Sequence, residues 1–461
     1  MAKIPQPSLF SWKEIDAASD LDRFRLVLDV LPDEELVSFL EEQRGKGRDD
    51  YPVRPVWNAL LAGIIYQHRS SASMLRELRR NGQLRDLCGF EPQRGMAAVP
   101  TQDAFGRFLG LVILHREKVL GIYHRLVNEL GEVLPDLGRR LAVDSKAIPS
   151  AGKPVPNEEQ QKEADGRREL DADWGVKKYH GNRKDGSKWE KVIKWFGFKL
   201  HLLVDSTYEL PLVFKLTKAS AGDSPQLGEL LREHRAEHPR VAVRAEELAA
   251  DKAYDSAQNK ASLYDEHQIV PIIDHRQMWK EEPGEPRPLY GDRPDVVLYD
   301  ELGRVYCQSP CEGRGADERR EMQYVGFEKD RMTQKWRCPA AYNGYECKGR
   351  KTCERFAREK VGAYGRVIRV PLSKDRRIFT PVARPIPKWK KAYARRTSVE
   401  RVNSRIDCVF LFEEHFIRGQ AKMETRVILA LMVLLAMALG RIRVNQHDLM
   451  RSLTAPVRRA A

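Results

Sequence analysis

The chain has 461 residues, of which 42% are hydrophobic and 32% are charged. This composition excludes wholesale disorder and a collagen-like chain, and the length predicts two or three domains. Lys and Arg total 80 against 66 Asp and Glu, so the formal charge of +14 favours a polyanionic partner such as nucleic acid. A basic protein without such a partner is the alternative.

No segment of the chain predicts export or membrane insertion. The first residues lack the apolar core of a secretory signal, and the longest apolar run, 427–440, suits a buried helix better than a bilayer span. The seven cysteines are an odd number, which argues against a disulfide framework. We therefore expect a protein of the reducing cytoplasm that makes no membrane contact.

The first 130 residues or so predict helices. Apolar side chains recur at spacings of three and four, the period of a helix with one buried face, over 21–39, 56–66, 70–87 and 101–127. Thr101 is suited to begin the last of these helices. The arginines of this segment form either a DNA-facing surface or an ordinary solvated face.

From residue 139 the pattern changes to alternating strands and helices. A short apolar strand at 141–143 ends in Asp144, and strands at 195–204 and 210–216 predict an antiparallel hairpin. The polar stretch 149–188, between the first strand and this hairpin, predicts a mobile surface loop. Its basic residues either grip DNA or face solvent.

The alternation continues toward residue 273. We expect a helix at 226–237, a strand at 247–250, a helix at 256–267 and a strand at 269–273. Asp223 precedes Ser-Pro and is predicted to cap the first of these helices rather than to bind a ligand. Lys199 and His201 share one face of their strand, and they either point toward an active site or support the structure.

The segment 275–372 interrupts this alternation and predicts an inserted β-rich subdomain. It is rich in Pro, Gly and charge, and its short strand-like pieces lie at 296–299, 304–306 and 366–370. Helical periodicity then returns at 398–410 and 425–442.

Between Lys374 and Arg396 the chain carries nine basic residues and one acidic residue, with Trp389 and Tyr393 among them. Such a stretch is typical of a surface that contacts phosphates, with aromatic rings available for stacking. The alternative is a solvated linker. We favour nucleic acid because the stretch leads directly into a candidate catalytic carboxylate, Glu400.

Three acidic residues have a context that indicates chemistry. Asp144 and Asp251 each follow a short apolar strand, and Glu400 lies early on a helix behind the basic stretch. Each residue alone is better explained as a turn, a cap or a surface ion pair. Together, oxygen ligands from two strand ends and a helix could hold two hard divalent cations for an in-line displacement at phosphorus.

The motif Tyr393-x2-Arg396-x3-Glu400 resembles that of the DDE transposases of bacterial insertion sequences, whose catalytic core is ribonuclease-H-like. WFGFKLHLLVDSTYELPLVFKLTKASAGDSPQLGELL, at 195–231, is similar to the family's second and third strands. ADKAYDS, at 250–256, resembles its second-Asp motif, and RRTSVERVNSRI resembles its third-carboxylate helix. The N-terminal helices resemble the domain that precedes the core in many members, so the resemblance spans most of the chain.

The resemblance implies that Asp144, Asp251 and Glu400 are the catalytic triad and hold two Mg²⁺ ions, or Mn²⁺ in their place. It also implies that Tyr393 and Arg396 contact DNA phosphates near the scissile bond. The basic stretch adds four further predicted DNA-binding residues: Arg395, Lys388, Lys390 and Lys391.

The sequence departs from the fuller family signature at one position. Members with that signature carry a Lys seven positions after the Glu, and this chain has Asp407 there. Arg401, Arg405 or Arg418 could supply the missing cation, or the contact could be absent.

Five of the seven cysteines fall in the predicted insertion. Four thiolates in tetrahedral array would suit a structural zinc, although the spacings are loose and reduced thiols are the alternative. Because there are five candidates for four places, the assignment stays open among Cys307, Cys311, Cys338, Cys347 and Cys353.

Taken together, the sequence predicts an α/β protein with a ribonuclease-H-like mixed sheet flanked by helices. The expected parts are a helical N-terminal DNA-binding domain at 1–135, a catalytic core at 136–275 and 386–461, and a β-rich cysteine-containing insertion at 276–385. The expected function is that of a DNA transposase that cleaves element ends and transfers their 3′-hydroxyls to target DNA. A metal-dependent nuclease on the same fold and a non-enzymatic DNA-binding protein are the alternatives.

The expected partners are DNA, as terminal inverted repeats and as target, and a second copy of the chain when two ends are synapsed. The expected location is the bacterial cytoplasm, in association with the nucleoid.

Overall fold

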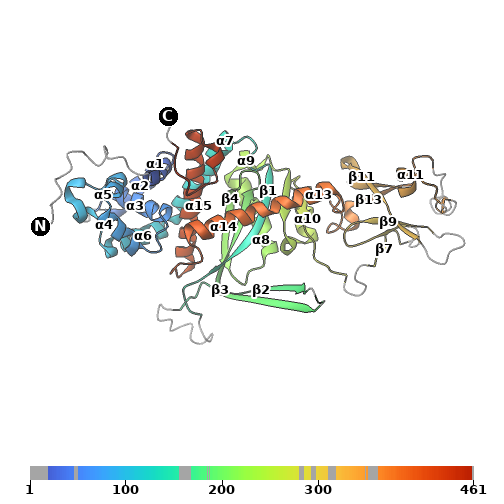
Figure 1. The fold of residues 1–461 in the computed structure, drawn as a ribbon, viewed down its shortest axis with the longest axis horizontal. Helices are drawn as coiled ribbons and strands as arrows, with labels where there is room; N and C mark the ends of the chain where they lie inside the picture. Colours follow the sequence, from blue (N-terminus) through green and yellow to red (C-terminus); the bar gives the residue numbers. More distant parts are fainter. Residues whose placement is uncertain are drawn as a thin grey trace.

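The molecule is elongated, with N-terminal helices at one end, a β-rich segment at the other and a mixed sheet between them (Figure 1). This is a computed structural model. It describes residues 19–45, 50–154, 168–183, 185, 187–279, 285–291, 297–309, 318–347, 349–350, 353 and 362–458.

The N-terminal region is helical, as its apolar periodicity predicts. The intervals 21–39, 70–87 and 101–127 each hold two helices rather than one. In the first of them, Pro32 disfavours helical backbone in the residue before it. Thr101 caps its helix as predicted, and its side chain accepts a hydrogen bond from the N–H of Ala104. The helices are α1 (Ser19–Leu28), α2 (Glu34–Arg44), α3 (Val53–Ile65), α4 (Ser71–Arg80), α5 (Gly82–Cys88), α6 (Gln102–Leu114) and α7 (Arg116–Val133).

The central sheet is six-stranded and mixed. Its strands are hydrogen-bonded in the order β2-β3-β1-β5-β6, and β4 also pairs with β3. The β3–β1 and β3–β4 pairs are antiparallel, whereas β1, β5 and β6 run parallel. The strands are β1 (Arg140–Pro149), β2 (Asp173–Asn182), β3 (Lys188–Asp205), β4 (Leu210–Lys218), β5 (Glu247–Ala250) and β6 (Val270–Ile273).

The predicted surface loop at 149–188 is wrong over part of its length. Residues 173–182 form β2, which pairs with an early part of β3 that begins seven residues before the predicted strand. The sequence did not reveal this pair because lysines occupy both of its faces, so no apolar alternation marks a buried side.

Helices cover both faces of the sheet. Lys146 on one face reaches α14 (Thr397–Phe410), whereas Lys199 on the other reaches α8 (Asp223–Glu237). The helices α9 (Pro239–Ala242) and α10 (Ala257–Asp265) complete the connections between β4 and β6.

The strands expected in the inserted segment are present and belong to two further sheets. These surround their own apolar cluster, which includes the buried rings of Trp336 and Phe379. One sheet has the order β10-β9-β8-β7 and the other β11-β12-β13. The elements are β7 (Arg287–Pro288), β8 (Val297–Tyr299), β9 (Val305–Ser309), β10 (Glu318–Glu321), β11 (Gln323–Glu328), β12 (Thr333–Arg337), α11 (Pro339–Asn343) and β13 (Val367–Pro371).

The chain returns to the central sheet through α13 (Pro387–Tyr393) and α14, and then enters α15 (Gln420–Arg443). Among the described residues, α15 is the one helix long and apolar enough to cross a membrane, but 94% of its most apolar window is buried inside the fold. It packs against α7, α1, α3 and β4. This agrees with the prediction of a buried core helix.

Three buried histidines connect α7 to the region between α8 and α9. His124 Nδ1 lies 3.0 Å from His238 Nε2, and His234 Nδ1 lies 3.3 Å from His238 Nδ1. Burial lowers the pKa of all three; for His238, where the neighbouring histidines add to the effect, it falls to about 2. All three rings are therefore neutral at pH 7.

We expect the free energy of unfolding to fall as the pH drops below about 6.5. Below that pH the unfolded chain binds protons that the buried rings of the folded protein do not bind. Each histidine then lowers the free energy of unfolding by up to about 1.4 kcal/mol per pH unit. Urea denaturation at pH 7.5, 6.5 and 5.5 measures this slope. His124→Gln should reduce it, whereas His447→Gln, at an exposed position, should leave it unchanged. An identical slope in both variants would contradict the assignment.

Candidate active site

Two of the predicted catalytic carboxylates lie side by side at the edge of the sheet. In the parallel pair β1–β5, Val143 is opposite Ala250, so the next residue of each strand, Asp144 and Asp251, emerges at the same level. β5 ends at Ala250, whereas β1 continues past Asp144 to Pro149, so the prediction that this strand ends at Asp144 is wrong. The parallel register of the two strands brings together acids that are far apart in the sequence.

The surroundings of Asp144 disfavour its negative charge. Burial raises the pKa of this carboxyl to about 6 and the charge of Asp251 adds to the effect, against the Ser145 N–H, Lys177 and Arg396. Asp251 also accepts a hydrogen bond from the N–H of Ala253 at 2.7 Å, so it caps the short turn that follows β5. The positive charges near Asp144 therefore do not offset its burial and the charge of Asp251.

The third predicted carboxylate, Glu400, lies on α14 and pairs with an arginine that precedes the helix. Glu400 Oε1 accepts from Arg396 Nη1 at 2.7 Å, and about half of the Glu400 side chain is exposed. Arg396 is also close enough to Asp144 to lower the pKa of that carboxyl, against the larger effects of burial and Asp251. The Arg396 guanidinium therefore pairs with the helix carboxylate and lies near one of the two strand carboxylates, Asp144.

Residues on the opposite face of the sheet support the site from behind. Lys199 and His201 alternate away from Asp144 and approach Asp223 at 3.1 and 3.9 Å. Asp223 is the first residue of α8, after the N-cap Gly222, so its predicted role as the cap is wrong.

Tyr254 is a buried residue that the sequence patterns did not single out, although it lies within the ADKAYDS motif. Burial, and then the charges of Asp144, Asp223 and Asp251, raise the pKa of its hydroxyl far above the usual range. The Tyr254 phenol therefore stays protonated near Asp144, Asp223 and Asp251.

An ion pair fixes α14 against β1 beside the carboxylates. Lys146 Nζ lies 2.5 Å from Asp407, and the two side chains are 11% and 19% exposed. Lys146 follows Asp144 by two residues on the same strand face, and Asp407 follows Glu400 by seven residues, or about two helical turns. The residue that departs from the family signature therefore meets a cation from the strand.

Two of the three arginines considered as substitutes for the signature Lys, Arg401 and Arg405, have another partner. Arg401 Nε lies 2.6 Å from Glu209 Oε1, and Arg405 also pairs with Glu209. Glu209 lies in the connection between β3 and β4. These two arginines therefore hold α14 on the sheet.

The predicted DNA-binding residues lie on or next to α13. Lys388, Lys390 and Lys391 are exposed, whereas Arg395 pairs with Glu247 of β5. The aromatic rings of this stretch are used internally: Trp389 is buried and stacks on Tyr393 with their centroids 4.8 Å apart.

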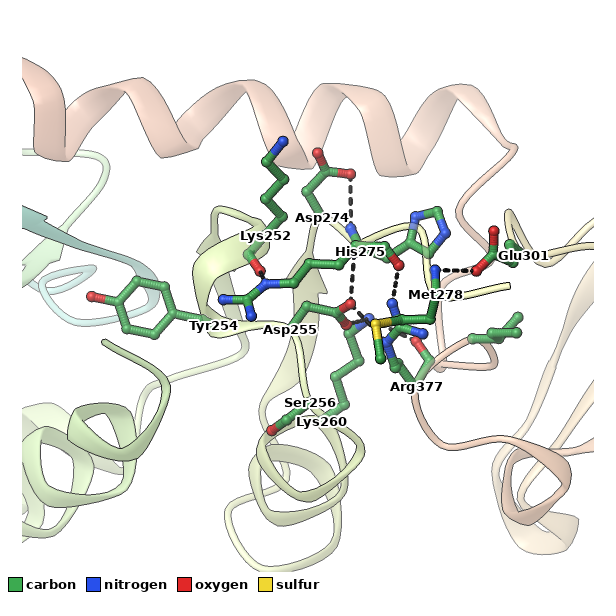
Figure 2. Close-up of polar contacts among 12 residues, drawn as sticks. Lys252, Tyr254, Asp255, Ser256, Lys260, Asp274, His275, Met278, Glu301 and Arg377 are labelled. Carbon is green, nitrogen blue, oxygen red and sulfur yellow. Dashed lines mark hydrogen bonds and ion pairs between the residues drawn. The ribbon is translucent and has the colours of Figure 1, made fainter. Parts of the chain in front are cut away.

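A buried ion network links the core to the inserted segment (Figure 2). Asp255, four residues after Asp251, lies 2.8 Å from Lys260 Nζ and 2.8 Å from Arg377 Nε, and accepts from the N–H of Arg276. Lys260 belongs to α10, whereas Arg377 comes from the end of the insertion. This network therefore holds the insertion against the loop that carries Asp251.

We expect Asp255→Asn to lower the free energy of unfolding by about 3 kcal/mol or more, because it leaves two buried cations without their anion. Urea denaturation measures this loss. Asp265→Asn is the matched control, since its ion pair with Arg376 is about half exposed and is worth less than about 1 kcal/mol. Equal losses in the two variants would contradict the role of the network.

Four of the five candidate zinc ligands come near one another. Burial raises the pKa of Cys307 to about 12, and the neighbouring thiols of Cys353, Cys338 and Cys347 add to the effect. Cys311 lies outside the described residues.

Within the described part of the chain, no three His, Cys, Asp or Glu side chains are grouped closely enough to hold one metal ion. The magnesium and zinc ligands predicted from the sequence therefore remain predictions.

The fold and the site together define a mixed α/β protein with paired carboxylates on adjacent parallel strands and a basic helical stretch. The chain belongs to the DDE transposases of insertion sequences. Residues 136–436 match the family described as Transposase DDE domain, and residues 12–110 match a family described as Transposase domain (DUF772).

Two other comparisons add little to this assignment. No curated protein matches the chain in sequence. A cryo-EM structure of a piggyBac transposase synaptic complex with hairpin DNA aligns over 95% of this chain and 80% of that chain, with 10% identity and a TM-score of 0.33. A likeness this low supports no residue-by-residue correspondence.

Proposed function

We propose that this transposase binds the terminal inverted repeats of its element, cleaves phosphodiester bonds there and joins the freed 3′-hydroxyls to target DNA by two-metal in-line displacement. One observation supports the proposal: Asp144 and Asp251 lie side by side on the parallel strands β1 and β5, and Arg396, which pairs with Glu400, is close enough to Asp144 to influence its ionisation. We infer that the core is ribonuclease-H-like. The mixed strand order β4-β3-β1-β5-β6, with helices on both faces, supports that inference.

The donor set suits hard divalent cations. Asp144 and Asp251 are acidic neighbours short of positive charge, and burial with this neighbour raises the pKa of Asp144 to about 6. Asp144, Asp251 and Glu400 would hold two Mg²⁺ ions, or Mn²⁺ in their place. Bound there, the ions would activate the attacking oxygen and stabilise the leaving oxygen.

The chain's own residues bind and orient the DNA in this proposal. Arg396 pairs with Glu400, and it would be available to a phosphate if Glu400 ligated the cations instead. Tyr393 lies beside Arg396 and positions the same phosphate. The exposed Lys388, Lys390 and Lys391 bind the backbone. Arg395 contributes a further contact to the DNA from its position beside Glu247.

We assign the N-terminal helices, 1–135, to DNA binding. We place the catalytic core at 136–275 and 386–461 and the insertion at 276–385, as predicted from the sequence. Two copies act together when two element ends are synapsed. The protein works in the bacterial cytoplasm at the nucleoid. One structural Zn²⁺ among the insertion cysteines is part of the proposal, and metal analysis of the purified chain tests it.

Strand transfer with pre-cleaved ends separates this function from its alternatives. A transposase joins the 3′-hydroxyl of a pre-cleaved end to a target plasmid in Mg²⁺. A nuclease on the same fold would cut DNA without joining it, and a DNA-binding protein without catalysis would shift the ends in a gel and do neither. Failure of joining in both Mg²⁺ and Mn²⁺ would overturn the proposal.

A further inference from the structure

The pair of strands formed by β2 and the start of β3 leaves the body of the sheet. Residues 198–205 of β3 pair with β1 and β4, whereas residues 188–196 pair only with β2 among the described strands. Figure 1 shows the resulting two-stranded ribbon extending away from the helices and the rest of the sheet. We call residues 173–182 and 188–196 the ribbon.

Two tryptophans give the ribbon internal order. Trp195 lies opposite Gly175 and Trp189 lies opposite Gly181. A Cβ atom added to Gly175 would come within 2.3 Å of the Trp195 indole, and one added to Gly181 would come within 2.5 Å of the Trp189 indole. Each indole therefore packs directly over its glycine. These cross-strand pairs stiffen the ribbon.

The ribbon exposes large apolar side chains on both of its faces. Trp174 and Val176 are each 51% exposed, and Val192 and Ile193 are 45% and 40% exposed. An isolated two-stranded ribbon is marginally stable in water, and grouped exposed apolar side chains mark binding surfaces. The ribbon therefore fits a surface that a partner covers.

The charge of the ribbon favours an anionic partner. The segment 173–196 contains seven Lys or Arg against three Asp or Glu. Lys177, Lys188, Lys191 and Lys194 are exposed. A second copy of this chain, with its formal charge of +14, would meet these lysines with repulsion, whereas DNA presents a regular row of phosphates.

The position of the ribbon places that partner next to the carboxylates. Gly197, where the ribbon joins the sheet, is opposite both Asp173 of β2 and Pro149 of β1, and β1 is the strand that carries Asp144. DNA that follows the ribbon would therefore pass the site edge.

We propose that the ribbon is a DNA-binding arm that lies in the major groove beside the bond to be cut. A two-stranded antiparallel ribbon fits that groove, its lysines reach the flanking phosphates, and its apolar side chains meet base edges such as the thymine methyl group. This inference rests on the proposed function and names the surface that holds the DNA there.

The salt dependence of binding to an element-end duplex tests the arm. In the full-length protein, Lys191→Gln with Lys194→Gln should lower the slope of log K against log salt by about 2, since each lost phosphate contact removes about 0.9. The matched control is Lys329→Gln with Arg331→Gln, two exposed cations of the inserted segment. Both double variants should keep the wild-type circular dichroism spectrum. Equal slopes in the two variants would overturn the proposal.

Sedimentation and strand-transfer measurements distinguish a DNA-binding arm from a contact between two copies of the chain. If Trp174→Ser with Val176→Ser changes the oligomeric state in sedimentation without DNA and leaves DNA affinity unchanged, the ribbon joins two copies and the proposal fails. If the wild type binds ends through the ribbon but joins nothing, the proposed function fails and the arm stands. If the wild type joins ends and the lysine variants bind like it, the arm fails and the function stands.

Discussion

Asp144→Asn is expected to abolish cleavage and strand transfer while making the metal-free protein more stable. Activity should fall by about a thousandfold or more, the scale on which direct electrostatic stabilisation of a reaction contributes. The unfolding free energy should rise because burial and Asp251 raise the pKa of Asp144 to about 6, so its ionised form at pH 7 costs stability that Asn does not. That cost is on the order of 1–3 kcal/mol.

The sign follows from the two states of the carboxyl. Its pKa is near 4 in the unfolded chain and about 6 in the folded one, so this group's contribution to stability falls as the pH rises between those values. Urea denaturation in a chelator at pH 7, together with cleavage of a labelled element end, measures both effects. Mg²⁺ should stabilise the wild type and not the variant.

Asp330→Asn is the matched control, since Asp330 is exposed in the inserted segment. It should change neither stability nor activity, and DNA-end binding should survive in both variants. Full activity of Asp144→Asn in Mg²⁺ would remove this residue from the site. A large loss of stability instead would assign it a structural role. A residue that weakens the fold while serving the reaction is common at active sites.

The adjacency of Asp144 and Asp251 was within reach of the sequence. Each acid directly follows a short apolar run, and the resemblance to the DDE family implied that the two acids share one site. The contact between Glu400 and Arg396 was also foreseeable as a pair four residues apart on a helix. The approach of Arg396 to Asp144 was not, because it depends on how α14 crosses the sheet.

The ribbon and the role of Asp223 show where local pattern fails. A strand buried on neither face has no reason to alternate apolar and polar residues, so Trp174 and Val176 stand among lysines without a readable period. Asp223 has the sequence context of a cap, but Lys199 on the facing strand draws its carboxylate into an ion pair. In the first case burial was absent, and in the second an ion pair with a residue of another strand changed the role of the carboxylate.

Exchanging Lys146 and Asp407 in a double variant is expected to restore the stability and activity that either single change removes. Lys146→Asp places two carboxylates together, and Asp407→Lys places two ammonium groups together, at a site that is less than a fifth exposed. Each single variant should lose about 3 kcal/mol of unfolding free energy, the scale for breaking a largely buried pair. The double variant recovers the attraction with the charges exchanged, so most of that loss should return.

Activity should follow the same pattern because the pair sets the position of α14 on β1. Lys146 lies two residues from Asp144 and Asp407 lies seven from Glu400, so a shift of the helix along the strand moves Glu400 away from the strand carboxylates. A displacement of about 1 Å can cost a hundredfold in rate. End binding should change little in any of the three proteins, which separates positioning from DNA contact.

The exchange also tests the departure from the family signature directly. The double variant carries a Lys seven positions after Glu400, where members with the fuller signature have one, and its strand carries the acid. Cleavage rates of the wild type, both single variants and the double variant form a complete cycle. Recovery of both stability and cleavage in the double variant would show that the pair acts through its attraction. Recovery of stability alone would mean that the ammonium group of Lys146 serves the DNA from β1 and cannot do so from α14.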